Sequence, residues 1–334
     1  KLEDKVILFS NDSPQEVSVE VRAGAANISG KVFLEVPNNW IVSPTEIKFS
    51  ITQKKDKQTV VFNVTPPKNE SEGILKVVAV SDGKEFRKEL IEIDYNHIPK
   101  QSVLMKSEAK VVRLNIQKAG SYIAYIKGAG DTVPESLRQI GYTVVTIKPE
   151  DISTENLKKY DAVVMGIRAY NVIKELQFKQ KYLLNYVENG GNMIVQYNTS
   201  RNVDVGAPFS LTLSRDRVTD EFAEVRVLDK NHSLLNFPNK ITDKDFEGWV
   251  QERGLYFPGT WSKEYTSILS MNDKNEIPKK GSLLIAKYGK GNYIYTGLSF
   301  FRELPAGVSG AYKLFANMLS VGKDKIIINK EIKK

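Results

Sequence analysis

Polar side chains that could bind a ligand follow three predicted strands of one sheet. Their amide and guanidinium groups suit hydroxyl-rich or acidic ligands. The carboxyl ends of parallel strands lie at one edge of an open α/β sheet, where such sheets bind their ligands, so these side chains should converge there. The alternative is an internal hydrogen-bond network that pins long loops. The predicted ligand-binding residues are Arg168, Asn171, Gln196, Asn198 and Arg302.

Aromatic side chains should cover the same edge. The segment 249–261 is dense in aromatic residues and glycine, and it contributes Trp249, Tyr256 and Trp261. These rings are expected either to form a stacking wall for a sugar or to fill a satellite core. Trp40, near the other end of the chain, poses the same choice between a sugar platform and a core residue.

The turn after the predicted strand 192–196 is where many hydrolases and amidotransferases carry a nucleophile. The chain has no cysteine, and this turn has no G-x-S-x-G. A serine-type hydrolase using Ser200 as nucleophile and His232 as base is one alternative, because triads assemble in space. However, Ser200 has no neighbouring glycine, and His232 beside Asn231 is typical of a turn cap.

Metal sites and cofactors are not expected. With no cysteine and only His97 and His232, thiolate sites and His-rich sites are excluded. The carboxylates Asp216, Asp220 and Glu221 could hold calcium or magnesium, but the interleaved arginines favour surface ion pairs. His97 has no nearby partner, so we assign it no catalytic role.

The stretch 128–131, Gly-Ala-Gly-Asp, joins a predicted strand to a predicted helix, as a phosphate-binding loop would. It lacks the third glycine of a dinucleotide fingerprint and the lysine of a Walker loop. The sequence therefore favours a tight turn capped by Asp131 or Thr132.

Length and composition indicate an ordinary two-domain protein. The chain has 334 residues, 41% of them hydrophobic and 26% charged. Its net charge of +8 comes from dispersed lysines, which favours a solubilising surface over nucleic-acid binding. No apolar run approaches the ~20 residues that span a bilayer. No signal peptide is visible and the chain begins with Lys1, so we interpret it as a mature or excised fragment.

The residues before 98 alternate apolar and polar side chains in about seven short strands, which predicts a two-sheet sandwich. Strands and helices alternate from about 104 onward, which predicts a parallel, doubly wound sheet. We expect strands at 121–126, 142–147, 161–165, 192–196 and 292–296, and a long loop at 204–220. The predicted parts are a sandwich at 1–98, a linker and entry strand at 99–112, an α/β domain at 113–325 and a basic tail at 326–334.

Four stretches together resemble one family: 125–131, 166–171, 195–199 and 296–308. They are similar to the C-terminal half of large bacterial PIG-L (LmbE-like) deacetylases. In that family a zinc-dependent sugar N-deacetylase domain precedes an immunoglobulin-like β-sandwich and a flavodoxin-like domain of the class I glutamine-amidotransferase type. The resemblance implies this fold class for the chain, and a periplasmic or extracellular location.

The resemblance also implies what the chain lacks. The A-H-P-D-D-type zinc motif of the deacetylase domain is absent, as are the amidotransferase cysteine and the histidine after the strand 292–296. Without thiolate and base there is no activated nucleophile, so this chain is predicted not to be an enzyme although its parent is a hydrolase. We expect an accessory region that recognises a carbohydrate or glycoconjugate, or positions the deacetylase domain of the same parent chain. A purely structural module is the other alternative.

Overall fold

A computed structural model of the chain describes residues 1–199 and 203–323. The chain divides into two compact units, Lys1–Asn115 and Ile116–Lys334, here called the β unit and the α/β unit. The boundary therefore lies at 115 and not at 98. The predicted linker and entry strand, 99–112, are strands of the β unit, and the predicted basic tail lies outside the described residues.

Two of the three sheets of the β unit share one core. In spatial order the larger sheet is formed by β1 (Val6–Phe9), β11 (Glu108–Arg113), β7 (Ser71–Ser81), β3 (Ile28–Glu35) and β5 (Ile47–Ile51), with β8 (Lys84–Phe86) paired to β7. The smaller sheet is formed by β2 (Gln15–Arg22), β6 (Lys57–Thr65) and β4 (Ile41–Ser43). Alternate side chains of both sheets enter one hydrophobic core, as the period-two pattern predicted.

Trp40 belongs to that core. Its ring packs edge-on against Phe9 at 5.0 Å, and its indole N–H donates to the Ser71 hydroxyl over 3.2 Å. With its ring enclosed and its only polar atom satisfied, Trp40 is a core residue and not a sugar platform.

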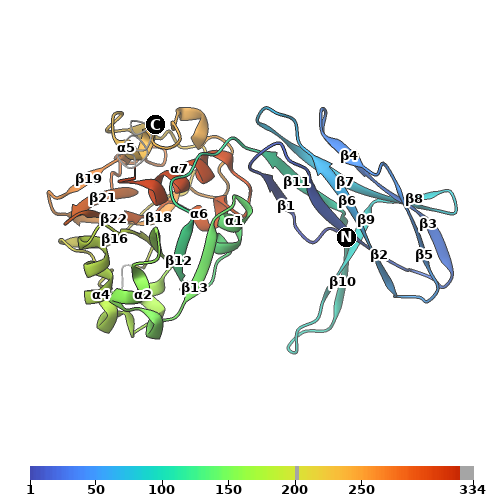
Figure 1. Cartoon of the computed structure of the whole chain (residues 1–334), viewed down its shortest axis with the longest axis horizontal. Coiled ribbons are helices and arrows are strands. Elements are labelled where there is room, and N and C mark those ends of the chain that lie inside the picture. The colour runs from blue at the N-terminus through green and yellow to red at the C-terminus, as the bar shows by residue number, and fades with distance from the viewer. Residues whose placement is uncertain (200–202, 324–334) are drawn as a thin grey trace. The chain divides into compact units, whose positions relative to one another are not determined.

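Five parallel strands form the centre of the α/β unit (Figure 1). In spatial order the sheet consists of β13 (Thr143–Ile147), β12 (Tyr122–Ile126), β14 (Ala162–Met165), β15 (Asn192–Gln196), β22 (Gly291–Thr296), β21 (Leu283–Tyr288) and β19 (Tyr265–Ser267). β21 and β19 are antiparallel to their neighbours. Numbered along the chain, the parallel strands run 2-1-3-4-5, one of the two common orders of doubly wound sheets.

Both faces of this sheet are covered. Leu157 of α2 and Leu183 and Val187 of α4 share a core with alternate residues of β12, β14 and β15. On the other face α7 packs on β15, where the Asn192 amide donates to the Met318 carbonyl. The helices of the unit are α1 (Val133–Gln139), α2 (Thr154–Leu157), α3 (Ala169–Val172), α4 (Leu176–Glu188), α5 (Ser233–Asn236), α6 (Phe300–Glu303) and α7 (Ser309–Ser320), with 3-10 turns η1 (Pro149–Asp151) and η2 (Asp243–Phe246).

The sequence predicted one long loop at 204–220, and this prediction is wrong. The segment contains β16 (Leu211–Val218), which pairs with β18 (Gly254–Trp261) through a register with three shifts. Such bulged pairing between distant segments leaves no regular alternation in the sequence. A shorter pair, β17 (Arg226–Val227) with β20 (Leu269–Ser270), completes the described strands of this unit.

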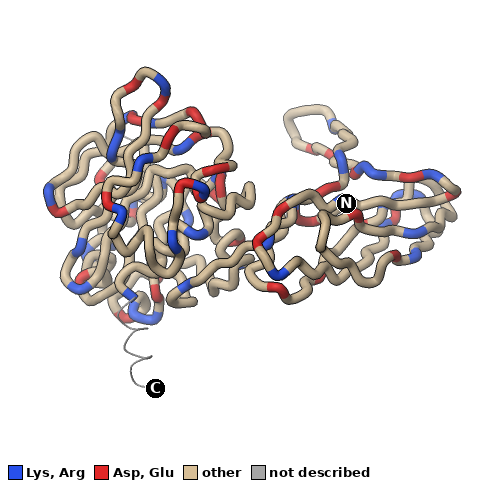
Figure 2. Tube along the Cα trace, turned by 90° about the horizontal axis from the view of Figure 1, so that it is seen from above, with Lys and Arg blue, Asp and Glu red and all other residues tan. Residues whose placement is uncertain are grey.

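Acidic and basic residues are interspersed along the trace of each unit (Figure 2). Among the helices formed by residues 1–199 and 203–323, none has the length and hydropathy to cross a membrane.

Candidate functional site

The crevice between β12 and β14, where a doubly wound sheet reverses its winding, is closed by backbone. The turn after β12 packs directly on the turn after β14, with the Ala129 N–H donating to the Ile167 carbonyl over 2.9 Å. A Cβ atom at Gly128 would lie 2.1 Å from that carbonyl oxygen, so only glycine fits. The Gly128–Asp131 turn thus fills the position at which a ligand is usually bound in such sheets.

A buried hydrogen-bond network lies beneath this turn. The Tyr125 hydroxyl donates to the Asp131 carboxylate over 2.7 Å, and the Gln196 amide donates to Tyr125 over 3.0 Å. Asp131 also accepts the Val133 N–H at the start of α1, whereas Thr132 occupies the N-cap position and makes no side-chain cap bond. Burial is the main reason that the pKa of Tyr125 is raised well above its usual range, with Asp131 adding to it. Gln196 is therefore a network residue and is not exposed to a ligand.

The two asparagines predicted to bind a ligand are also used internally. Asn171 and Thr199 form a reciprocal pair: the Asn171 amide donates to the Thr199 hydroxyl over 2.8 Å and accepts the Thr199 N–H over 2.9 Å. Asn198 is fully buried, donates to the Gln196 carbonyl and accepts the Tyr170 N–H. Asn171, Gln196 and Asn198 thus all take part in an internal network, as the alternative predicted, although the Gln196 amide oxygen has no hydrogen-bond partner among the described residues.

Arg168 differs from these residues. Its backbone is left-handed, at φ 56° and ψ 23°, and its N–H donates to the Tyr197 carbonyl over 2.8 Å. This conformation is costly for a long side chain and is held by the surrounding structure. The side chain is exposed, and among the described residues its guanidinium makes no hydrogen bond or ion pair.

Three rings beside Arg168 form a continuous row, which we call the aromatic row: Tyr256, Tyr197 and Phe301. Tyr197 stacks on Tyr256, with centroids 6.0 Å apart and planes 11° apart, and contacts Phe301 at 5.2 Å. The guanidinium of Arg302 lies over Phe301, 4.8 Å from its centroid. Burial raises the pKa of Tyr197, while the positive charges of Arg168 and Arg302 act in the opposite direction.

The positioning of Arg302 depends on a strained loop. Its Nε donates to the Glu252 carboxylate over 2.9 Å, and Nη1 donates to Gln251. Gln251 has φ 68° and Tyr256 has φ 52°, so with Arg168 three non-glycine residues adopt left-handed conformations around the aromatic row. Backbone strain of this kind concentrates at functional sites, and here it points to the aromatic row.

The predicted aromatic wall is only partly present. Tyr256 belongs to the row, but Trp249 is 3% exposed, packs between Phe246 and Phe300, and donates its indole N–H to the Asp245 carbonyl. Trp261 packs instead on the core shared with α4. Sequence reasoning did not single out Tyr197, which is 8% exposed, or Phe301, which is half-buried, although Tyr197 directly follows a buried strand.

The geometry of His232 does not suit a triad. Its Nδ1 accepts the Leu234 N–H over 3.1 Å and caps α5, whereas a catalytic histidine donates from Nδ1 to a carboxylate. Burial lowers the pKa of His232, with Asp229 opposing. Ser200, its predicted partner, lies outside the described residues.

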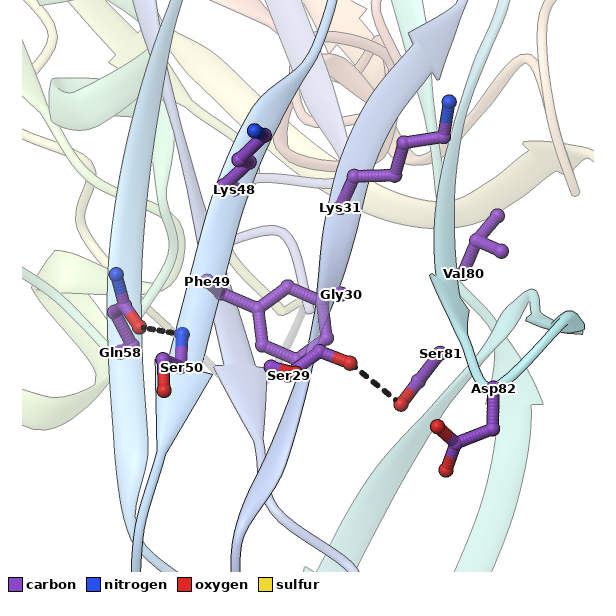
Figure 3. Close-up of a pocket in the computed structure, with 10 residues that line it drawn as sticks. All are labelled: Ser29, Gly30, Lys31, Lys48, Phe49, Ser50, Gln58, Val80, Ser81 and Asp82. Carbon is purple, nitrogen blue, oxygen red and sulfur yellow. Dashed lines mark hydrogen bonds between the residues drawn. The ribbon is translucent and has the colours of Figure 1, made fainter.

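Two further features show no sign of a site. Among the described residues no three acidic or histidine side chains cluster as metal ligands, and Asp220 accepts the Phe222 N–H. A hollow on the β unit lies over β3, β5 and β7 (Figure 3). Three of its polar side chains have partners: Ser81 donates to the Ser29 carbonyl, Gln58 accepts the Ser50 N–H, and Lys31 pairs with Glu46 at 2.7 Å.

No model of a protein family matches the chain, and no curated protein matches it. The solved structure of a putative GMP synthase component from Thermoplasma acidophilum is 13% identical, with a TM-score of 0.42, over 64% of this chain and 100% of that one. A putative ThuA-like protein from Bacteroides uniformis is 15% identical, with a TM-score of 0.36, over 61% of this chain and 92% of that one. At these values neither similarity assigns the chain to a family.

Proposed function

We propose that the aromatic row with Arg168 and Arg302 is a weak binding site for a carbohydrate or glycoconjugate that carries a carboxylate. The observation that supports it best is the Arg168 guanidinium, which has no hydrogen-bond or ion-pair partner within 1–199 and 203–323 and extends from a left-handed backbone bonded to the stacked Tyr197. Tyrosine rings suit the apolar faces of sugars. Arginine makes bidentate hydrogen bonds to carboxylates.

The wider proposal is that the chain is a non-catalytic accessory region of a PIG-L-type N-acetyl-sugar deacetylase. In support, the strand order 2-1-3-4-5 is that of flavodoxin-like domains, to which the amidotransferase resemblance points. The two sheets with a shared core support an immunoglobulin-like sandwich before it. The deacetylase domain of the parent chain is the proposed intramolecular partner, and no cofactor is proposed.

Arg168→Ala is expected to weaken binding of glucuronate, used as an acidic sugar probe, by roughly tenfold or more. Removing one partner of a charged hydrogen bond costs about 1.5–3 kcal/mol, and about 1.4 kcal/mol is a factor of ten. Arg168→Lys should recover only part of the loss because lysine has no planar fork. Isothermal titration calorimetry measures the affinities.

Arg138→Ala is the control, since this exposed arginine lies in the last turn of α1, away from the carboxyl edge of the sheet, and its guanidinium is already bonded to the Val144 carbonyl and Glu135. It should leave glucuronate binding unchanged. If neither glucuronate nor N-acetylglucosamine binds the unsubstituted chain, and Arg168→Ala only alters the melting temperature, the aromatic row is structural.

The purified chain is expected to hydrolyse neither glutamine nor an N-acetyl sugar, with or without added zinc. The reason is the absence of cysteine from the whole sequence, together with the acceptor role of His232 Nδ1. Ammonia and acetate release are the measurements. Turnover that disappears in His232→Ala would instead establish the serine-hydrolase alternative.

A further inference from the structure

The hairpin formed by β9 (Lys88–Ile93) and β10 (Gln101–Lys106) projects from the rest of the β unit (Figure 1). The two strands pair with each other over six residues without a bulge and form a separate two-stranded sheet. Every residue of β10 is exposed, including Val103 at 37%, Leu104 at 62% and Met105 at 51%. Three consecutive large apolar side chains therefore face solvent on one strand.

The two edges of this hairpin differ. β9 is fixed to the unit by ion pairs, because Glu89 contacts Lys5 at 2.7 Å and Glu92 contacts Arg22 at 2.6 Å. β10 is the outer edge. An isolated two-stranded sheet is marginal in water and gains stability from a third strand. Proteins usually protect an exposed edge with charges, proline or a bulge, and β10 has only Lys106 at its end.

We propose that β10 pairs antiparallel with β10 of a second copy of this chain. A two-fold axis normal to the sheet relates the two β10 strands, so an equivalent side chain lies on the same face in both copies. Residues that lie opposite each other across the two strands must share a face, so their numbers differ by an even number. Centring the axis on Leu104 places Leu104 opposite Leu104, Val103 opposite Met105, and Lys106 opposite Ser102. All three apolar positions then meet apolar partners and no like charges are opposed, which favours a second copy over an unrelated strand.

The test uses the absence of cysteine from the chain. In Leu104→Cys the two thiols would be directly opposed, within reach of a disulfide. Opposed thiols have an effective concentration in the millimolar range. Mild oxidation of the full chain at micromolar concentration should therefore yield covalent dimer at least about tenfold faster than Ile277→Cys, a control at the α/β-unit side chain that is 82% exposed. Val103→Cys should cross-link with Met105→Cys faster than either variant with itself.

Sedimentation of the unmodified chain supplies the second measurement. A concentration-dependent dimer that Leu104→Lys converts to monomer, with an unchanged circular dichroism spectrum, supports the proposal, since the lysines would be directly opposed. A chain that stays monomeric and cross-links through Leu104→Cys no faster than through Ile277→Cys overturns it, and β10 is then an edge for another protein or domain. A dimer that persists in Leu104→Lys also overturns it.

Discussion

A chain that ends after Asn115 is expected to fold, whereas a chain that ends after Ile98 is expected not to. The shorter chain loses β11, which lies between β1 and β7 and is the only strand paired with β1 in that sheet. The fully buried side chains of Val111 and Val112 go with it. Each buried apolar side chain is worth about 1.5–3 kcal/mol. Together with the lost pairing, this approaches the total stability of about 5–15 kcal/mol of a typical domain.

Thermal melts followed by circular dichroism distinguish these outcomes. The 1–115 chain should melt cooperatively, and the 1–98 chain should show no transition. A third chain, in which a short glycine-serine loop replaces 94–100, is the control because it leaves β11 intact. Cooperative melting of the 1–98 chain at a similar temperature would show that β11 is dispensable and that the boundary lies earlier than the packing indicates.

The boundary illustrates where sequence patterns mislead. Pro99 and its polar neighbours indicated a linker, but they form the loop of the β9–β10 hairpin. Patterns fixed by local chemistry were reliable. The strand predicted at 192–196 has these bounds in the structure, because a short buried run there lies between turn residues. Strands such as β16 and β18, which depend on a distant and bulged partner, were not foreseen.

In the candidate site, too, features set by the local sequence were predicted, and features set by distant partners were not. The sequence placed Arg168 and Arg302 at the carboxyl edge of the sheet because each follows a strand. It could not distinguish a free side chain from one that is already bonded. The amide of Asn171 is bonded to Thr199, 28 residues away in the sequence. The guanidinium of Arg302 is bonded to Glu252, 50 residues away. Such pairings are set by tertiary geometry and leave no mark on composition or periodicity.

Glu303, near the aromatic row, is a buried acid that the sequence did not single out. It is 0% exposed. One carboxylate oxygen accepts the Val250 N–H over 2.9 Å, and the other has no hydrogen-bond partner among the described residues. Burial raises the pKa of Glu303 to about 8, and Glu252 adds to the rise. The Val250 N–H, Arg253 and Arg302 oppose it. The folded protein therefore holds this carboxyl protonated at neutral pH.

Glu303→Gln should make the protein more stable than the unsubstituted protein at pH 9 and about equally stable at pH 4. The folded state binds the Glu303 proton more tightly than the unfolded state, whose pKa is near 4.5. The stability of the unsubstituted protein is thus complete below pH 4.5 and falls as the pH rises toward 8, where the carboxylate must be buried with its charge. Glutamine is neutral, has the same shape and can still accept the Val250 N–H. A tenfold change in proton binding corresponds to about 1.4 kcal/mol, so the gain at pH 9 is on the order of a few kcal/mol.

Urea unfolding of both proteins at pH 4 to 9 measures the difference between their free energies of unfolding. The contributions of the other titrating groups cancel in this difference. Glu175→Gln, at an exposed position, is the control. A difference between Glu303→Gln and the unsubstituted protein that is constant with pH would mean that Glu303 is charged in the folded protein at neutral pH, paired with Arg253 or Arg302.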